Sequence, residues 1–507
     1  MGTPNLVLDL ARIRSDAHNG TLSVDYLIDI IEQQQHRIKR LEADKRQLAE
    51  RLAKYEPEAA PRPDTNEPQN RNASYSVEAE EKRRQQRSGR RRRREKSPGR
   101  TPTEQKFAAA QKYEDVYPDG VEPATCHLVR ERAVWRFIAN KAVRVGYRIY
   151  AGPDGKEPPI PGVTPRCEYG IEILVVLAFL VYVVGMSIDK ACVIMCFFCE
   201  LPLAKSQADA LLRQLAQHWE VEYETLCDML VHAAVVYMDE TGWKVGNEKC
   251  SMWTFASQLH RVFLFGCHKD DATLDAMLPP DKFDGIGVSD NAKVYYQRFT
   301  RGQKCWAHLL RKAIKLALEY PDNTKYQGFL DALLQIYYDA KRVAADKRLG
   351  EEGRKQKVVD LVDRLARLLL PHMEATDGNA TVAEQEFTAL ANEIGTLLMA
   401  EELFTFVLHP EVDPTNNLTE REERPSTQDR KAGRTNKTTK GARRRSVIMS
   451  VLHSLQVNME DFKLVSVVKE IEKWMKEGIS LFTKQWEEMQ ERLRAKAAAE
   501  AATANTV

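Results

Sequence analysis

The stretch VVYMDETGWKV, residues 235–245, decides the fold. It opens with a run of apolar and β-branched residues that leads into Asp239, and this pattern is typical of a buried strand with a functional group at its end. The pattern returns in GIGVSDN, residues 285–291, where a second short apolar run leads into Asp290. We therefore expect two buried strands whose terminal aspartates converge on one divalent metal ion.

The segments around these runs predict an α/β domain. Strands are expected at 235–240, 252–258 and 261–268, a helical piece at 273–277, and a short strand leading into a helix at 303–319. Three strands, a helix, a fourth strand, a helix and a fifth strand follow the order of a ribonuclease-H-like α/β domain.

Composition indicates an ordinary soluble protein. The chain has 507 residues, 43% hydrophobic and 29% charged, which favours several domains. Its nine cysteines are odd in number and mostly lie in apolar contexts, so we expect reduced, buried thiols, Cys196 among them. The first twenty residues hold no signal-peptide core. The longest apolar run, 173–186, is shorter than the roughly 18 residues of a membrane span, so we interpret it as a buried core helix. The expected location is cytoplasmic, with no membrane partner.

Changes in composition and periodicity divide the chain. The expected parts are a coiled-coil helix for dimerisation (1–56), a disordered basic linker (57–112), a small β-rich module (113–165), a helical domain that binds DNA (166–232), the first part of the catalytic core (233–319), a helical insertion (320–410), the last part of the core with a third carboxylate (411–460) and a C-terminal helical tail (461–507).

Two of these parts have plainer alternatives. The heptad seam of residues 21–55 predicts a dimer, but an amphipathic helix packed on its own chain would show the same pattern. The run KRRQQRSGRRRRREK, residues 82–96, is expected to neutralise DNA phosphates. A solvated linker or a nuclear address would have a similar composition.

A third carboxylate is expected in HPEVDPTNNLTEREERP, residues 409–425. Its turn and N-cap residues place Glu420 in the first turns of a helix that Pro425 should interrupt. A basic tract (430–445) and an amphipathic helix (446–456) follow. Two aspartates at strand ends are a weak signal alone, because aspartates at such positions are common caps and turn residues.

Four motifs together resemble a known family. DETGWKV (239–245), SDN (289–291), KCWAHLLR (304–311) and NNLTEREERP (416–425) are similar to the core motifs of DDE transposases of the bacterial insertion-sequence-66 type. The resemblance covers residues 165–460. It implies that Asp239, Asp290 and Glu420 are the catalytic, metal-binding triad. The implied cofactor is Mg²⁺, with Mn²⁺ as an alternative, at two ions per active site.

The resemblance also implies a mechanism and partners. The protein would cut DNA at the ends of an insertion sequence and join the freed 3′ hydroxyl to target DNA. It would act in the bacterial cytoplasm, associated with the nucleoid, as a homodimer or higher oligomer, and accessory transposition proteins are further candidate partners. The expected DNA-binding residues are Arg83, Arg84, Arg90, Arg91, Arg92, Arg93, Arg94, Lys244, Trp306, His308, Arg421, Arg424, Arg430, Lys431, Arg443 and Arg444.

Several alternatives stay open at this point. Trp306 and His308 would equally suit core packing, and Trp243 has the same two readings. Glu240 and Glu423 are rival carboxylates, since Glu423 lies one turn after Glu420 if the helix continues. The family's usual cysteine-rich zinc segment lacks its C-x-x-C pair here, which leaves the mode of DNA-end recognition open. A catalytically inactive transposase-derived DNA-binding protein and a nuclease without strand transfer are the alternative functions.

Overall fold

The computed structural model describes residues 101–373 and 380–504. The expected coiled coil (1–56) lies outside the described residues. So do most of the basic linker and its predicted DNA contacts Arg83, Arg84 and the arginines of 90–94. Nothing in the structure therefore tests those predictions.

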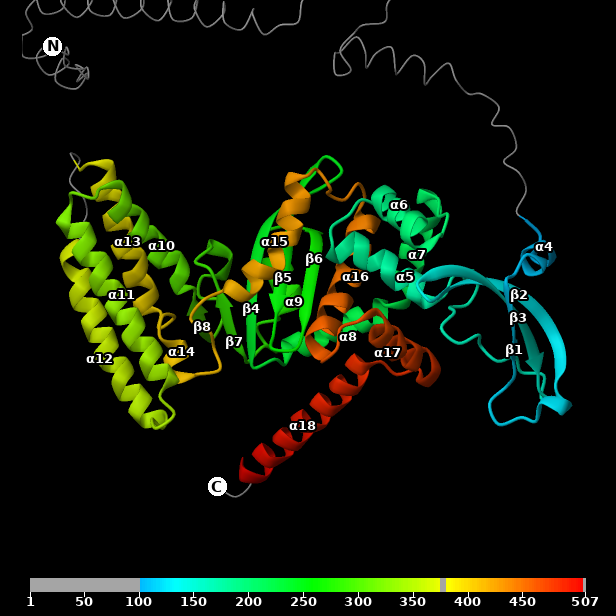
Figure 1. The fold of residues 1–507 in the computed structure, drawn as a ribbon. Helices are drawn as coiled ribbons and strands as arrows, with labels where there is room; N and C mark the ends of the chain where they lie inside the picture. The colour runs from blue at the N-terminus through cyan, green and yellow to red at the C-terminus, as the bar shows by residue number, and fades with distance from the viewer. Residues whose placement is uncertain (1–100, 374–379, 505–507) are drawn as a thin grey trace, which may run out of the picture. The chain divides into compact units, whose positions relative to one another are not determined.

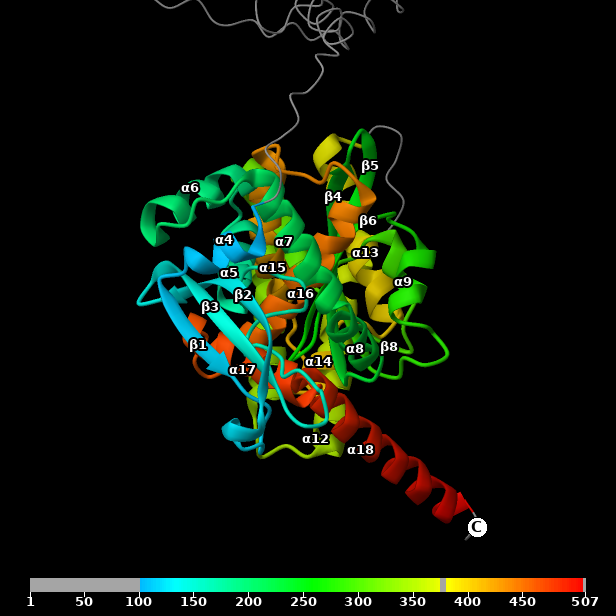
Figure 2. The ribbon, with the colours of Figure 1, turned by 90° about the vertical axis from the view of Figure 1, so that its right-hand side faces the viewer.

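The folded part begins with a short helix and a small sheet. α4 (Thr103–Ala108) precedes β1 (Lys112–Val116), β2 (His127–Ile138) and β3 (Lys141–Ala151), and a 3-10 turn (Pro123–Thr125) leads into β2. The strands lie in the order β1-β3-β2, with β1 parallel and β2 antiparallel to β3 (Figure 2). A sheet is present where the β-rich module was expected. However, α4 and the start of β1 lie in residues that we had assigned to a disordered linker.

Four helices follow the small sheet. They are α5 (Ile171–Ala178), α6 (Ile188–Cys199), α7 (Lys205–His218) and α8 (Glu220–Val231), and a π-helical turn (Phe179–Val183) continues α5. The apolar run 173–186 is largely buried, as predicted, but it breaks at Gly185, which has a φ of 76°. Among the described helices, none is long and apolar enough to cross a membrane. Cys196, expected as a buried thiol, is exposed on α6.

A five-stranded mixed sheet carries both aspartates. Its strands are β4 (Val235–Val245), β5 (Glu248–Ala256), β6 (Arg261–Cys267), β7 (Ile286–Ser289) and β8 (Arg301–Lys304), in the order β6-β5-β4-β7-β8 (Figure 1). β4, β5 and β6 form an antiparallel meander, and β7 and β8 continue the sheet parallel to β4. α9 (Asp271–Met277) precedes β7. A 3-10 turn (Lys293–Tyr295) precedes β8, and α10 (Trp306–Glu319) follows it.

The α16 helix (Thr439–Asn458) closes the β6 edge of this sheet. Three alternate backbone N–H groups of β6 donate to serine hydroxyls of α16, at 2.9–3.0 Å: Phe265 to Ser446, Phe263 to Ser450, and Arg261 to Ser454. Four helical residues rise about 6 Å and two strand residues about 6.6 Å, so the two series stay in register. The edge is thereby unavailable for pairing with another strand. Residues 446–455 are all buried, so the prediction of an amphipathic helix there was wrong.

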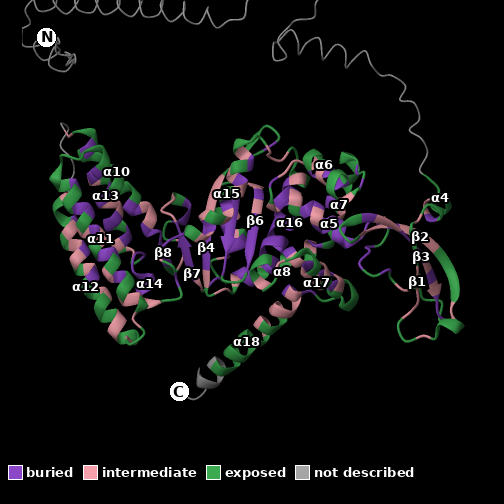
Figure 3. Cartoon of the chain, viewed as in Figure 1, coloured by how far each residue is buried: buried purple, intermediate pink, exposed green. Residues whose placement is uncertain are grey.

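Helices fill the chain between α10 and the third carboxylate. They are α11 (Thr324–Ala345), α12 (Glu351–Leu369), a 3-10 turn (Leu370–His372), α13 (Val382–Met399) and α14 (Thr405–Leu408). Their apolar faces form one core with α10 and β7, which Tyr237 of β4 also joins (Figure 3). The all-helical pattern predicted for 320–410 is thus present.

The α15 helix (Asn417–Lys431) brings back the NNLTEREERP motif. Pro425 lies inside this helix and does not interrupt it, contrary to our prediction. The proline removes only the bond to the carbonyl of Arg421, an exposed residue whose carbonyl water can satisfy. Contacts of α15 with β4 and β5 stabilise the helix. The chain ends in α17 (Leu464–Glu477) and α18 (Leu481–Ala504).

Candidate functional site

Asp239 lies on β4 just beyond the last residue that pairs with β7. We had placed it at a strand end, but β4 runs on to Val245 because its antiparallel pairing with β5 continues through this segment. The parallel neighbour β7 does end here: its last pair with β4 is Tyr237 with Val288. Two further steps in this register bring Asp239 opposite Asp290. The two aspartates therefore meet at the carboxyl end of β7 rather than at the end of β4.

A tight turn holds Asp290 just past β7. Its Oδ1 accepts the backbone N–H of Ala292 at 2.9 Å, an Asx turn that fixes the side chain at its first torsion angles. The hydroxyl of the preceding Ser289 donates to the Asp290 carbonyl at 3.0 Å. The other carboxylate oxygen of Asp290, Oδ2, takes no part in the hydrogen bonds of this turn.

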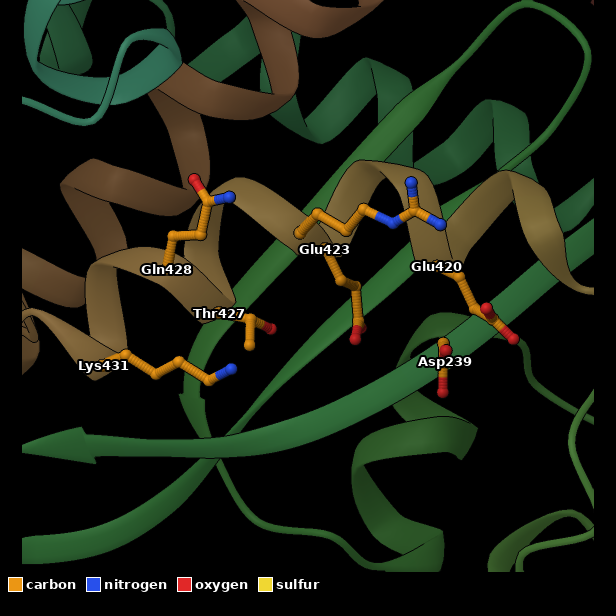
Figure 4. Close-up of a pocket in the computed structure, with 7 residues that line it drawn as sticks. Asp239, Glu420, Glu423, Thr427, Gln428 and Lys431 are labelled. Atoms are coloured by element: carbon orange, nitrogen blue, oxygen red, sulfur yellow. The ribbon is translucent and has the colours of Figure 1, made fainter. Parts of the chain in front are cut away.

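The α15 helix lies across β4 and supplies two glutamates on one face. Figure 4 shows Glu420 and Glu423 reaching from α15 toward the strand that carries Asp239. The three carboxylates line an open cleft of about 340 Å³ whose wall continues along α15 through Arg424, Thr427, Gln428 and Lys431. The spacing of three residues between the two glutamates places them one turn apart on the helix.

Burial and repulsion from nearby carboxylates raise the pKa values of Asp239 and Glu423. Burial, and then the charge of Asp290, raise the pKa of Asp239 to about 7. Burial, and then the charge of Asp239, raise the pKa of Glu423 to about 9. Carboxylates gathered in this way favour either protonation or a bound cation. At neutral pH Glu423 is the one expected to keep its proton.

Glu420 has two basic neighbours from α10, Arg311 and His308. Its two oxygens accept hydrogen bonds from Arg311 at 3.1 and 3.3 Å, and His308 Nε2 lies 3.8 Å from Oε1. His308 and Arg311 are one turn apart on α10, so both reach the same carboxylate. Arg311 was absent from our predicted site residues, although its helical spacing from His308 was a usable signal.

Asn416 attaches the start of α15 to both neighbours of the site. Its side-chain Nδ2 donates to the carbonyl of Met238 at 2.8 Å, and its backbone N–H donates to Cys305 Sγ at 3.2 Å. The residue is fully buried. These bonds fix α15 against β4 one residue before Asp239 and against the first turn of α10.

Glu240 is an unsuitable third ligand in this arrangement. It forms an ion pair with Lys269 and accepts a short hydrogen bond from the Tyr295 hydroxyl. Both oxygens of its carboxylate thus have partners. Lys269 and Tyr295 are further polar neighbours of the site that the sequence did not indicate.

The predicted DNA contacts divide into two groups. Lys244, Arg421, Arg424 and Lys431 are exposed, and the last two line the cleft. The others have partners within the chain. Arg430 donates to the Thr241 hydroxyl at 2.8 Å, while Arg443 and Arg444 form ion pairs with Glu220 and Asp209, respectively.

The two predicted DNA contacts in the KCWAHLLR motif, Trp306 and His308, also differ in exposure. Trp306 is fully buried, and its indole N–H donates to the Leu403 carbonyl at 2.7 Å. It therefore occupies the core, which was its alternative interpretation. His308 remains partly exposed beside Glu420. Trp243 is also buried, and its N–H donates to the Asn436 side chain at 2.9 Å.

The donor set fits a hard divalent cation. Asp239, Asp290 and Glu420 offer only oxygen atoms, which Mg²⁺ and Mn²⁺ prefer. Burial first, and then the charges of Asp290 and other nearby carboxylates, raise the pKa of Asp239, and a bound cation would offset both effects. Cys305, His308 and Glu420 form a second group whose ligand atoms all lie within 4.8 Å of one another. That set of sulfur, nitrogen and oxygen suits a softer ion.

One comparison with known proteins is informative. Residues 166–444, more than half of the chain, match the family described as "Transposase IS66 family". This span includes β4 to β8, α10 and α15, and so Asp239, Asp290 and Glu420. No curated protein matches the chain.

Proposed function

This chain belongs to the IS66 transposase family, and from that premise we propose that it cuts DNA at the ends of an insertion sequence and joins them to target DNA. Members of a transposase family act on DNA, and the DDE type of transposase uses divalent metal ions. The finer proposal is that Asp239, Asp290 and Glu420 are the acids that hold those ions.

One observation carries this proposal: three carboxylates from β4, the β7 end and α15 converge although 181 residues of sequence separate the first from the last. Electrostatic repulsion makes such a cluster unfavourable without a cation or proton. We also propose that the domain is ribonuclease-H-like. Its meander β4–β6, extended on the β4 side by parallel β7 and β8, supports that assignment.

The proposed reaction needs little covalent chemistry from the protein. When bound, two divalent ions stabilise the charge on the attacking and leaving oxygens of an in-line displacement. Water attacks a phosphodiester at the element end and leaves a 3′ hydroxyl, and that hydroxyl then attacks a phosphodiester of target DNA. Asp239 of β4 and Asp290 just past β7 would hold the ions from the side of the sheet, and Glu420 would hold them from α15.

The basic residues orient the DNA. Arg424 and Lys431 line the cleft beyond the acids, where they would contact the DNA phosphates. Arg311 balances the charge of Glu420 before the ions bind. His308 lies close enough to Glu420 to contact the scissile phosphate or a leaving group.

Glu420 is the third ligand in this proposal, and Glu423 is not. The family motif places the acid at Glu420, and burial raises the pKa of Glu423 to about 9. A protonated carboxyl is a poor metal ligand. Glu423 instead fills the space between α15 and β4 as a neutral group.

The test is strand transfer with purified full-length protein, Mg²⁺ and a labelled element-end duplex. We expect Asp239→Asn, Asp290→Asn and Glu420→Gln to bind the duplex but to lose both cleavage and joining. Asp284→Asn is the matched control, because this aspartate precedes β7 but its side chain is 85% exposed and lies outside the cleft.

Other outcomes identify the alternatives. If the wild type binds its correct ends but never cuts them, the protein is a DNA-binding descendant of a transposase. If it cuts but never joins, it is a nuclease without strand transfer. We propose in addition that it acts as a homodimer or larger assembly, and sedimentation of the DNA complex tests this.

A further inference from the structure

We propose that the helices between α10 and α15 position Asp290, with Glu393 of α13 as the main positioning residue. This inference rests on the proposed function and concerns the Asp290 loop, by which we mean Ser289, Asp290 and Asn291. It gives these helices a role in metal binding, beyond that of a spacer between the second and third acids.

Glu393 holds the loop on one side. Asn291 Nδ2 donates to Glu393 Oε1 at 2.8 Å, directly after Asp290 in the chain. Lys312 of α10 donates to both Glu393 oxygens at 2.6 Å. The Glu393 side chain is only 18% exposed, whereas that of Lys312 is 52% exposed. The carboxylate is therefore fixed by a cation and presents a charged acceptor to Asn291.

A second carboxylate from the same helical segment supports the other side of the loop. Lys304 is buried, and its Nζ donates to the Ser289 hydroxyl at 3.1 Å. The partner of Lys304 is Glu402, which follows α13 and lies 3.9 Å away, and the Glu402 carbonyl accepts the Lys304 backbone N–H at 2.7 Å. Both neighbours of Asp290 in the chain are thus tied to acids from one segment.

These contacts restrict Asp290 in a way that its own turn does not. The Asx turn fixes the Asp290 side chain relative to the loop, and β7 holds Ser289 in the sheet through its pair with Lys304 of β8, but neither involves the Asn291 side chain. Asn291 and Ser289 connect the loop to α13 and the following residues, which pack against α10. Residues that orient metal ligands from outside the ligand set typically change metal affinity by about 10- to 100-fold when replaced.

The structure supplies a matched control. Glu386 lies two helical turns before Glu393 on α13 and pairs with Lys315 of α10 at 3.4 Å. This pair joins the same two helices but has no bond to the Asp290 loop. Glu386→Ala should therefore lose a similar link between helices without disturbing Asp290.

The experiment is a titration of full-length protein with Mn²⁺, in which free Mn²⁺ is measured by electron paramagnetic resonance. Asp290→Asn identifies the binding that belongs to the proposed centre. We expect Glu393→Ala to weaken this binding about 10- to 100-fold and Glu386→Ala to leave it unchanged. Glu393→Gln keeps an oxygen acceptor for Asn291, and we expect it to restore most of the affinity.

Asn291→Ala removes the hydrogen bond between Asn291 and Glu393 and leaves α13 unaltered. It therefore tests the inference if Glu393→Ala does not fold. Equal Mn²⁺ affinity in Glu393→Ala, or in Asn291→Ala, and in the wild type would overturn the inference while leaving the proposed function intact. If Asp290→Asn does not weaken Mn²⁺ binding in the first place, the proposed metal centre fails and the inference fails with it.

Discussion

Asn416 donates its side-chain N–H to the carbonyl of Met238 across 2.8 Å, and so joins the helix that carries Glu420 to the strand that carries Asp239. The two residues are 178 positions apart in the chain. Their hydrogen bond is buried, and no other side chain of the described residues makes the same link from α15 to this carbonyl. It explains why an asparagine precedes the helix of the third acid.

The first prediction concerns this bond. Asn416→Ala leaves the Met238 carbonyl buried without its partner, which costs about 1–3 kcal/mol of unfolding free energy, and α15 should shift relative to Asp239. We expect lower thermal stability together with loss of cleavage. Asn417→Ala is the control, since its side chain is exposed at the next position. Equal behaviour of the two variants would show that the Asn416 bond is unimportant.

The second prediction separates the two glutamates of α15. Glu420→Gln should reduce cleavage by on the order of 10²-fold or more, because a metal ligand supplies several kcal/mol of transition-state stabilisation. Glu423→Gln replaces an acid that holds its proton at neutral pH with a neutral group of the same shape, so cleavage should change little. Single-turnover cleavage at saturating Mg²⁺ measures both. If Glu423→Gln lost more cleavage activity than Glu420→Gln, Glu423 would be the third metal ligand and Glu420 would not.

The third prediction is a pH dependence. The pKa of Asp239 lies at about 7 in the folded protein and at 3.8 ordinarily. Between these values the folded chain binds more protons than the unfolded chain, so this group makes the metal-free protein less stable as pH rises. Asp239→Asn removes the effect. In the presence of a chelator, the melting temperature of Asp239→Asn minus that of the wild type should therefore increase as pH rises between these two pKa values.

The same pKa controls metal binding. Because the ion must displace the Asp239 proton, Mg²⁺ affinity should fall about tenfold for each pH unit below the pKa, and it should level off above it. Calorimetric titration with Mg²⁺ over this pH range measures the slope. A flat profile would mean that Asp239 is already ionised without metal.

The fourth prediction concerns the neighbouring residues Trp306 and His308. Trp306→Phe removes the shorter of the two hydrogen bonds that the buried Leu403 carbonyl accepts, since Gln303 Nε2 also donates to it at 3.2 Å. The loss should cost about 0.5–1.5 kcal/mol of unfolding free energy. The DNA affinity of the folded protein should stay unchanged. His308→Ala should do the reverse, with little effect on stability and weaker cleavage. Chemical denaturation and cleavage assays distinguish the two variants, and duplex binding measures the DNA affinity of Trp306→Phe. Weaker DNA binding by Trp306→Phe at full stability would restore Trp306 as a DNA contact.

The fifth prediction uses salt. Arg424 and Lys431 line the cleft, so replacing either by alanine should reduce the slope of log affinity against log salt by about one. Arg444 pairs with Asp209, and its side chain is 14% exposed. Arg444→Ala should lower the melting temperature and leave that slope unchanged. A lower slope in Arg444→Ala would mean that this ion pair opens when DNA binds.

Local pattern determined much of this protein. The apolar runs before Asp239 and Asp290 predicted the strands, because a buried strand is recorded in consecutive residues. The periodicity of residues 320–410 predicted helices for the same reason. The motif around Glu420 indicated the third acid through family resemblance, and the family match confirms the resemblance.

The buried face of α15 could not be predicted from local sequence patterns. Its buried residues are polar, namely Thr419, Glu423, Ser426 and Asp429, so no apolar stripe marks the side that packs on the sheet. A helix of this composition would be taken for a solvated one. Only the packing against β4 and β5 buries it, and the same packing carries the helix through Pro425.

The sequence by itself thus determined most of the strands and helices between residues 235 and 410 and which acids were candidates. The tertiary structure alone decided that β4 continues past Asp239, that Arg311 and Asn416 accompany Glu420, that Trp306 belongs to the core, and that Glu393 supports the Asp290 loop. The physical reason is distance along the chain. Periodicity records the neighbours of a residue within one element, whereas these contacts join segments about a hundred residues or more apart, and only the folded packing brings them together.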